Sequence, residues 1–321
     1  MKYRQYEEAL GVTGYTAGFR RKDSGLHGKK IVNKAAEILW KIFRGVLLLG
    51  LSFVILYPLI YAVAMTFRPA EQVYDPTVVW ISKSLTLENL KNAAALMDYG
   101  QALVTSLRLN IVSSVLQVCI CAVTGYGFAR FNFKGKNLLF SLVLLTVLVP
   151  PQVIITPSFL AFKTLKLVNT AWTFYLPAMF GAGLKAGLFI FIFRQFFRGL
   201  PKELEEAAAI DGCGFFACFI RIIIPNASAV FLTTILLSFM WYWNDYYMSS
   251  MYMNNVNSVT NALVHLRANS TALTGDIAID PYKIITLMQS GSLLVIIPPL
   301  VLFLVLQRKF VQGIQKSGIV G

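Results

Sequence analysis

The stretch that decides the fold of this chain is acidic, rich in alanine and placed between long apolar runs. It reads Glu205-Glu206-Ala207-Ala208-Ala209-Ile210-Asp211-Gly212, and Pro225 follows after a further apolar segment. Carboxylates at a helix start stabilise the helix dipole, and glycine adopts backbone angles that a side chain would strain. The sequence therefore predicts a short helix, a glycine turn and a second, amphipathic helix. Between membrane spans, such a unit is suited to dock onto a cytosolic surface.

The composition predicts that the chain is an integral membrane protein. Of its 321 residues, 56% are apolar and 14% are charged, which is too apolar for a soluble domain. Several apolar runs reach the roughly 20 residues that a helix needs to cross a hydrocarbon core. The net charge of +14 comes from short basic clusters beside these runs. That placement fits the positive-inside rule and contact with membrane lipid, and we expect no nucleic-acid binding.

The distribution of charge divides the chain into a tail and a membrane domain. Residues 1–44 contain ten Lys or Arg against four acids, and they predict a cytoplasmic N-terminal tail that includes an amphipathic helix. No cleavable signal peptide is expected there. Residues 45–321 contain six apolar runs, at about 45–66, 102–128, 138–162, 175–197, 227–247 and 284–306. Basic residues close the runs on one side, so we expect an all-α membrane protein with six transmembrane helices and both termini cytoplasmic.

Proline and polar residues modify this pattern in two places. Pro150-Pro151 lies inside the third run and removes two helical donors, so a kink or an unwound break is expected there. Broken membrane helices commonly line a polar path. The segment of about 254–280, between the fifth and sixth runs, is polar and is expected to be rich in turns.

The sequence offers no catalytic or metal-binding constellation. Four cysteines are spread over an apolar run and the segment after Gly212, and the two histidines lie far apart. Free thiols that behave as small apolar groups are therefore expected, with no cofactor or metal in this chain. No G-x-x-x-x-G-K-[ST] motif is present, so this chain is not expected to hydrolyse ATP and is not expected to be an enzyme.

The residues around the acidic stretch resemble a known pattern of EAA, three residues, G, nine residues and I-x-L-P. Isoleucine stands where the pattern has leucine, and the matching residues are Glu206, Ala207, Ala208, Gly212, Ile222, Ile224 and Pro225. The stretch thus resembles the cytoplasmic coupling loop of an ABC importer permease. Further segments resemble the carbohydrate-uptake, maltose-type branch: Leu200-Pro201, Pro150-Pro151-Gln152, Trp243-Asn244-Asp245 and Gln307-Arg308-Lys309-Phe310-Val311-Gln312-Gly313.

The resemblance implies the fold, the partners and the location of this chain. It implies a type I ABC importer transmembrane domain in the bacterial plasma (inner) membrane. A second homologous permease subunit would pair with it, two ABC ATPase subunits would bind ATP and Mg, and an extracytoplasmic solute-binding protein would deliver the substrate. The coupling loop would cover about residues 200–226. Its expected ATPase-coupling residues are Glu206, Ala207, Ala208, Asp211, Gly212 and Pro225.

Four residues are candidates for the path of the substrate: Lys185, Trp241, Asn244 and Asp245. Lys185 would lie roughly 13.5 Å from Arg194 at 1.5 Å per residue, near the middle of the bilayer if its helix begins at Tyr175. An ionisable residue at that depth indicates a pathway. A later helix start, or a side chain that snorkels outward, is the alternative. The other three could meet sugar hydroxyls, although an interfacial aromatic belt also explains the tryptophan.

Three functions follow from these patterns. The first is a permease subunit that translocates a sugar or oligosaccharide, and Lys185 with Arg108 makes an acidic oligosaccharide one form of it. The second is an ABC importer permease for another solute, such as an amino acid, phosphate or osmolyte. The third is an ion-coupled carrier or channel, which the coupling loop disfavours.

Overall fold

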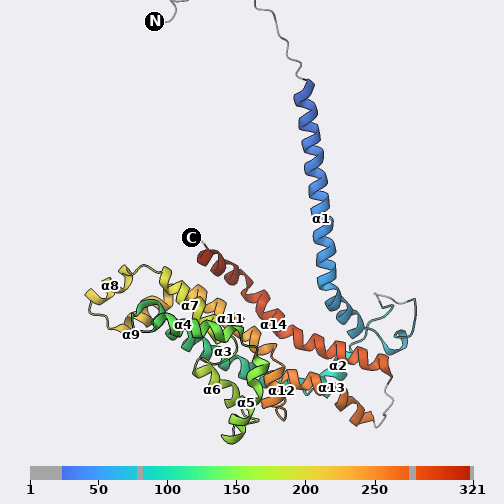
Figure 1. Cartoon of the computed structure of the whole chain (residues 1–321). Coiled ribbons are helices and arrows are strands. Elements are labelled where there is room, and N and C mark those ends of the chain that lie inside the picture. Colours follow the sequence, from blue (N-terminus) through green and yellow to red (C-terminus); the bar gives the residue numbers. More distant parts are fainter. Residues whose placement is uncertain (1–23, 78–81, 275–279, 319–321) are drawn as a thin grey trace, which may run out of the picture. The chain divides into compact units, whose positions relative to one another are not determined.

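A computed structural model describes residues 24–77, 82–274 and 280–318, and within them the secondary structure is helical (Figure 1). The chain forms two compact units, Met1–Pro58 and Leu59–Gly321. The predicted tail lies outside the described residues as far as residue 23.

The described part of the first unit, residues 24–58, lies within helix α1 (Ser24–Thr66). It runs without interruption through the predicted boundary at residue 44 and through Pro58. Its large apolar side chains are exposed in this unit, with Leu49 74% and Ile55 75% accessible. An apolar surface of this extent needs lipid or another subunit to cover it.

The second unit is built around α3 (Tyr99–Arg130), against which α7 (Ala186–Gly199) and α11 (Ser228–Trp243) pack (Figure 1). Gly125 makes the contact with α7 possible, because an added Cβ would lie 2.6 Å from Cβ of Phe193. The aromatic side chains Phe189, Phe193 and Phe197 of α7 are fully buried in this contact.

A second core lies around the start of α3, where α2 (Glu88–Leu96), α13 (Val259–Thr274) and α14 (Pro281–Gly318) meet. The prediction of a turn-rich segment at about 254–280 is wrong for the part that forms α13. Val259, Ala262 and Leu266 recur at helical spacing and are buried in this core. Tertiary packing therefore stabilises a helix that the polar composition of the segment does not predict.

The predicted break in the third apolar run is confirmed. Helix α4 (Lys136–Leu148) ends before the proline pair, α5 (Pro151–Thr164) begins at its second member, and the two helices are bent by 98°. Pro150 has an extended backbone, and Pro151 occupies the first turn of α5, where its missing N–H costs no helical hydrogen bond. Pro157 is accommodated inside α5.

The fourth apolar run is not one continuous helix, and this corrects the predicted span at 175–197. Helix α6 (Trp172–Met179) and α7 are separated by a non-helical segment that contains Gly181 at φ 68° and Lys185 at φ 57°. Gly183 in this segment leaves no room for a Cβ against Gln117 and Tyr242. The overall apolar character of the run predicts one span, although its glycines and Lys185 are local signs of a break. Lys185 therefore precedes its helix, which is the later start left open above.

Three helices in the described part of the chain are long and apolar enough to cross a membrane: Glu37–Thr66, Tyr99–Arg130 and Pro281–Gln307. Two bent pairs, Lys136–Leu148 with Pro151–Thr164 and Phe215–Asn226 with Ser228–Trp243, raise the number to five if each pair is one span. The six-span topology with both termini cytoplasmic stays a prediction.

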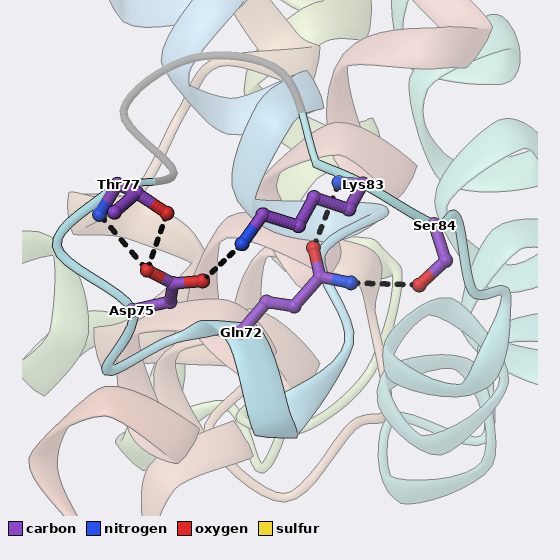
Figure 2. Close-up of polar contacts among 5 residues, drawn as sticks. All are labelled: Gln72, Asp75, Thr77, Lys83 and Ser84. Atoms are coloured by element: carbon purple, nitrogen blue, oxygen red, sulfur yellow. Dashed lines mark hydrogen bonds and ion pairs between the residues drawn. The ribbon is translucent and has the colours of Figure 1, made fainter.

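Polar side chains on either side of residues 78–81, between η1 (Ala70–Gln72) and α2, contact one another, as Figure 2 shows. The carboxylate of Asp75 accepts hydrogen bonds from the backbone N–H and hydroxyl of Thr77 at 2.9 and 2.6 Å, and Nζ of Lys83 lies 2.7 Å from it. Gln72 accepts from the backbone of Lys83 and donates to Ser84. These donors hold the pKa of Asp75 well below its usual range, so the carboxylate is ionised at neutral pH.

Candidate functional site

The acidic stretch forms helix α8 (Glu203–Ile210), as the sequence predicts. Its first turn carries three carboxylates, on Glu203, Glu205 and Glu206. Their negative charge lies at the positive end of the helix dipole, which stabilises a helix of only two turns.

The turn after α8 is a Schellman motif closed by Gly212. The backbone N–H of Cys213 donates to the carbonyl of Ala208 at 2.9 Å, and that of Gly212 donates to Ala209 at 3.1 Å. Gly212 has φ 77°, in the left-handed region that a side chain strains. An added Cβ would meet nothing within 4 Å, so the requirement for glycine comes from the backbone.

The chain then returns through α9 (Phe215–Cys218), a π-helical stretch η2 (Phe219–Ile223) and α10 (Ile224–Asn226). This return segment is bent by 79° relative to α11. Pro225 lies in α10, next to the bend, and marks the end of the loop. The loop of about residues 200–226 is therefore a helix–turn–helix that leads directly into a long apolar helix.

The loop is fastened to the ends of α3 and α7 by one ion pair and an aromatic cluster. Nε of Arg130 lies 2.7 Å from Oε1 of Glu205, and a second guanidinium nitrogen donates to the carbonyl of Leu200 at 3.0 Å. The ring of Tyr126 lies 4.8 Å from that of Phe219 and 5.4 Å from that of Phe197. These contacts join the loop to the ends of both helices.

The opposite side of α8 is open. Of the predicted coupling residues, Glu206, Ala207, Asp211, Gly212 and Pro225 are exposed, whereas Ala208 is buried against the chain's own core. The apolar side chains of Ile210 and Phe216 are 87% and 76% exposed beside them. Exposed apolar side chains with polar groups around them are typical of a surface that contacts a protein partner.

The structure brings together two of the four path candidates. Nζ of Lys185, just before α7, lies 5.2 Å from the ring centroid of Trp241 on α11. A cavity of about 330 Å³ beside Lys185 is also lined by Thr146, Pro151 and Gly183. The broken third and fourth runs therefore meet at this cavity.

A buried polar pair lies on the other side of the same segment. Tyr242 of α11 donates to the side-chain oxygen of Gln117 on α3, and the amide nitrogen of Gln117 donates to the carbonyl of Leu184 at 2.5 Å. A second cavity, of about 300 Å³, lies against Tyr242 and Leu184. The pair holds the non-helical segment 180–185 in place between the two cavities.

The remaining path candidates make local contacts. The amide of Asn244 donates to the carbonyl of Met240 at 2.9 Å, at the end of α11. The carboxylate of Asp245 accepts from the backbone N–H of Ser249 at 2.9 Å and so supports the start of α12 (Tyr247–Tyr252). Asn244 is exposed, and Asp245 is partly buried and bonded within the fold.

Comparison with known proteins decides the family. Residues 118–316, which include the whole loop, match the family described as binding-protein-dependent transport system inner membrane component. The chain belongs to this family. The permease is 30% identical over 277 residues to the arabinooligosaccharides transport system permease protein AraQ of Halalkalibacterium halodurans, covering 84% of this chain and 93% of that protein.

Two further similarities extend this finding. The permease is 28% identical to the osmoprotective compounds uptake permease protein GgtD of Synechocystis, over 88% of this chain and 93% of that one. Its fold matches a chain of a bacterial ABC transporter involved in the import of the acidic polysaccharide alginate. The TM-score of that match is 0.70 at 18% identity, over 86% of the permease and 98% of that chain. The all-α permease fold and the inner-membrane location are thus confirmed.

Sequence reasoning missed the residues that fasten the permease's loop and its broken helix. Glu205 belongs to the acidic stretch but is not among the predicted coupling residues, and Arg130 is not among the candidate site residues. Their ion pair joins positions 75 apart in sequence. Gln117 did carry a signal, because an amide inside an apolar run needs a partner in the membrane.

Proposed function

We propose that this permease subunit translocates a sugar or oligosaccharide that a solute-binding protein delivers, and that separate ATPase subunits drive it through the loop 200–226. A second homologous permease would complete the pathway. The observation that carries the proposal is the loop itself. One side is fastened to α3 and α7, and the other exposes Ile210, Phe216 and the acidic end of α8.

The geometry supports mechanical coupling through this loop. An ATPase subunit that binds Ile210 and Asp211 would displace α8 when it changes conformation. The ion pair of Arg130 with Glu205 would transmit that displacement to α3. The bend at Ala227 would pass it to α11, which carries Trp241 beside Lys185. One continuous set of contacts thus connects the exposed loop with the candidate path.

The nature of the solute is proposed from the path residues and from the relatives. Trp241 offers a ring on which a sugar face could stack, and AraQ is named for the transport of arabinooligosaccharides. The cation of Lys185, with Arg108 exposed on α3, would favour a substrate that carries carboxylates. The named substrate of the alginate transporter is acidic, in line with this form of the proposal. An osmoprotective compound, as in the name of GgtD, is the second candidate solute.

Uptake by the assembled importer tests the coupling. Ile210→Glu places a charge in the proposed contact, whereas the control Leu85→Glu makes the same change at a residue 77% exposed outside the loop. We expect Ile210→Glu to lower uptake at least tenfold and to release the ATPase subunits during purification, since a charge buried without a partner costs several kcal/mol. Wild-type uptake by Ile210→Glu would reject the loop as the coupling element.

Uptake of paired substrates tests the solute. Lys185→Met keeps the length of the side chain and removes its charge. If Lys185 contacts carboxylates, uptake of an acidic oligosaccharide falls about tenfold, while a neutral oligosaccharide of equal length is imported as before. Unchanged uptake of the acidic substrate would remove the acidic form of the proposal and leave the coupling intact.

A further inference from the structure

A strongly basic cavity of about 710 Å³ lies where the ends of α3, α4 and α7 meet. It is distinct from the two cavities beside the candidate path. Five cations line it, and none of its described lining residues is acidic: Arg130, Lys136, Arg194, Arg198 and Lys202. A cavity lined by charges of one sign attracts ions of the opposite sign, so this cavity favours an anionic ligand.

Two of the five cations are already engaged within the chain. Arg130 pairs with Glu205, and Nζ of Lys136 donates to the carbonyl of Phe131 at 2.7 Å. Arg194 and Arg198 are one helical turn apart on α7 and share one face with each other. Together with Lys202, these two arginines supply the charge that is left for a ligand.

Arg194 is held in position for an anion. Its guanidinium carbon lies 3.8 Å from the centroid of the Phe140 ring, so the planar group is fixed by stacking. Its Nε atom is buried and has no hydrogen-bond partner among the described residues. A buried donor without a partner is costly. Because Arg194 also lines the cavity, a shift of its guanidinium toward an anion there would give this donor an acceptor.

The surroundings of the cavity favour a lipid as the source of that anion. Leu138 lines the cavity and is 67% exposed at the start of α4. From there an apolar surface continues along the helix, and its exposed members are Leu139, Leu142, Leu144, Leu145 and Leu148. A phosphate in the cavity would thus have its acyl chains beside an apolar helix. A soluble phosphate would make no use of that surface.

We propose that this cavity binds the phosphate group of an anionic membrane phospholipid, with Arg194 and Arg198 as the main phosphate contacts and Lys202 at its edge. Arginine suits this role because its fixed fork donates two hydrogen bonds to phosphate oxygens. Basic pockets between membrane helices bind anionic headgroups by the same chemistry. Because Arg130 also lines the cavity, the bound lipid would lie next to the ion pair that fastens the loop.

Lipid titration of the purified importer, followed by native mass spectrometry, tests the proposal. The probes are dioleoylphosphatidylglycerol, dioleoylphosphatidylcholine and inorganic phosphate. The variant Arg198→Gln removes an exposed cation of the cavity, and the control Lys134→Gln removes an exposed cation from the neighbouring turn outside it. We expect the wild type to retain phosphatidylglycerol in preference to phosphatidylcholine. Arg198→Gln should weaken that binding about fivefold, the value typical of one basic residue near an anionic lipid.

The double variant Arg194→Gln/Arg198→Gln should weaken phosphatidylglycerol binding further, and Lys134→Gln should leave it unchanged. A thermal unfolding curve for each variant separates lost binding from lost folding, and Arg198→Gln leaves the stacked Arg194 in place. Equal phosphatidylglycerol binding by wild type and Arg198→Gln would overturn the proposal. Retention of inorganic phosphate that depends on Arg198, without preference for phosphatidylglycerol, would overturn the lipid as its source.

Discussion

Gly212 is needed for its backbone conformation and not for close packing, because its φ is positive and an added Cβ would meet no neighbouring atom. Gly212→Val would force a β-branched residue into the left-handed region, at a cost of roughly 1–2 kcal/mol or more. Gly214, two residues later, has φ −68° and equally open space, so Gly214→Val is its matched control. We expect Gly212→Val to abolish most uptake with the subunit still inserted, and Gly214→Val to retain it. Equal uptake by both variants would contradict the strained turn.

Glu205 is the residue that connects the loop to α3. The side chains of Arg130 and Glu205 are 8% and 23% exposed, so their ion pair is largely buried. Glu205→Gln weakens this pair and should lower the stability of the fold by about 1 kcal/mol. Glu203→Gln removes an exposed acid from the same helix turn and is the control. If the pair transmits movement, Glu205→Gln lowers uptake per ATP hydrolysed, whereas Glu203→Gln does not. Equal coupling ratios for both variants would show that the pair only supports the fold.

At the level of elements, α8 has a buried side and an exposed side, and its neighbouring residues Ala208 and Ala207 lie on one side each. Ala208→Asp buries a carboxylate without a partner in the loop's own core, so it should lower the thermal stability of the subunit. Ala207→Asp places the same group on the exposed side and should leave stability unchanged, but reduce co-purification of the ATPase subunits. The two variants therefore distinguish folding of α8 from docking. Loss of stability in Ala207→Asp would show that its side faces the chain itself.

The elements that could be predicted from the sequence are those whose cause is local. Helix α8, the turn at Gly212 and the break at Pro150-Pro151 depend on acids, glycine and proline at named positions. The sequence left a later start of α7 open but could not decide it, since the segment before α7 packs at Gly183 against Gln117 and Tyr242 from two other helices. Helix α13 was missed for the same reason, because its stabilising contacts are tertiary.

The candidate site divides in the same way. Its exposed loop surface follows from a contiguous motif, so the sequence names most of its residues. The Arg130–Glu205 pair, the Lys185–Trp241 contact and the basic cavity each join segments that are distant in the chain. Such juxtapositions need the packing of α3, α7 and α11, which hydropathy does not specify.

At the scale of the whole molecule, α3 connects two regions of the second unit, the loop around α8 and the core of α2, α13 and α14. Its 32 residues extend about 48 Å at 1.5 Å per residue, enough to cross a bilayer. The loop around α8 is fastened at Arg130, and the core of α2, α13 and α14 surrounds the start of α3 (Figure 1). If α3 spans the membrane, these two regions lie on opposite sides of it.

Cysteine labelling in whole cells tests this arrangement. In a background without the four native cysteines, Leu85→Cys should react with an impermeant thiol reagent, because this residue is 77% exposed and precedes α2. Ile210→Cys, 87% exposed on α8, should react only after the cells are opened, since the positive-inside rule places the basic end of α3 in the cytosol. Labelling of Ile210→Cys in intact cells would invert the topology. An inverted loop could not reach a cytosolic ATPase, so the same result would reject the proposed coupling as well.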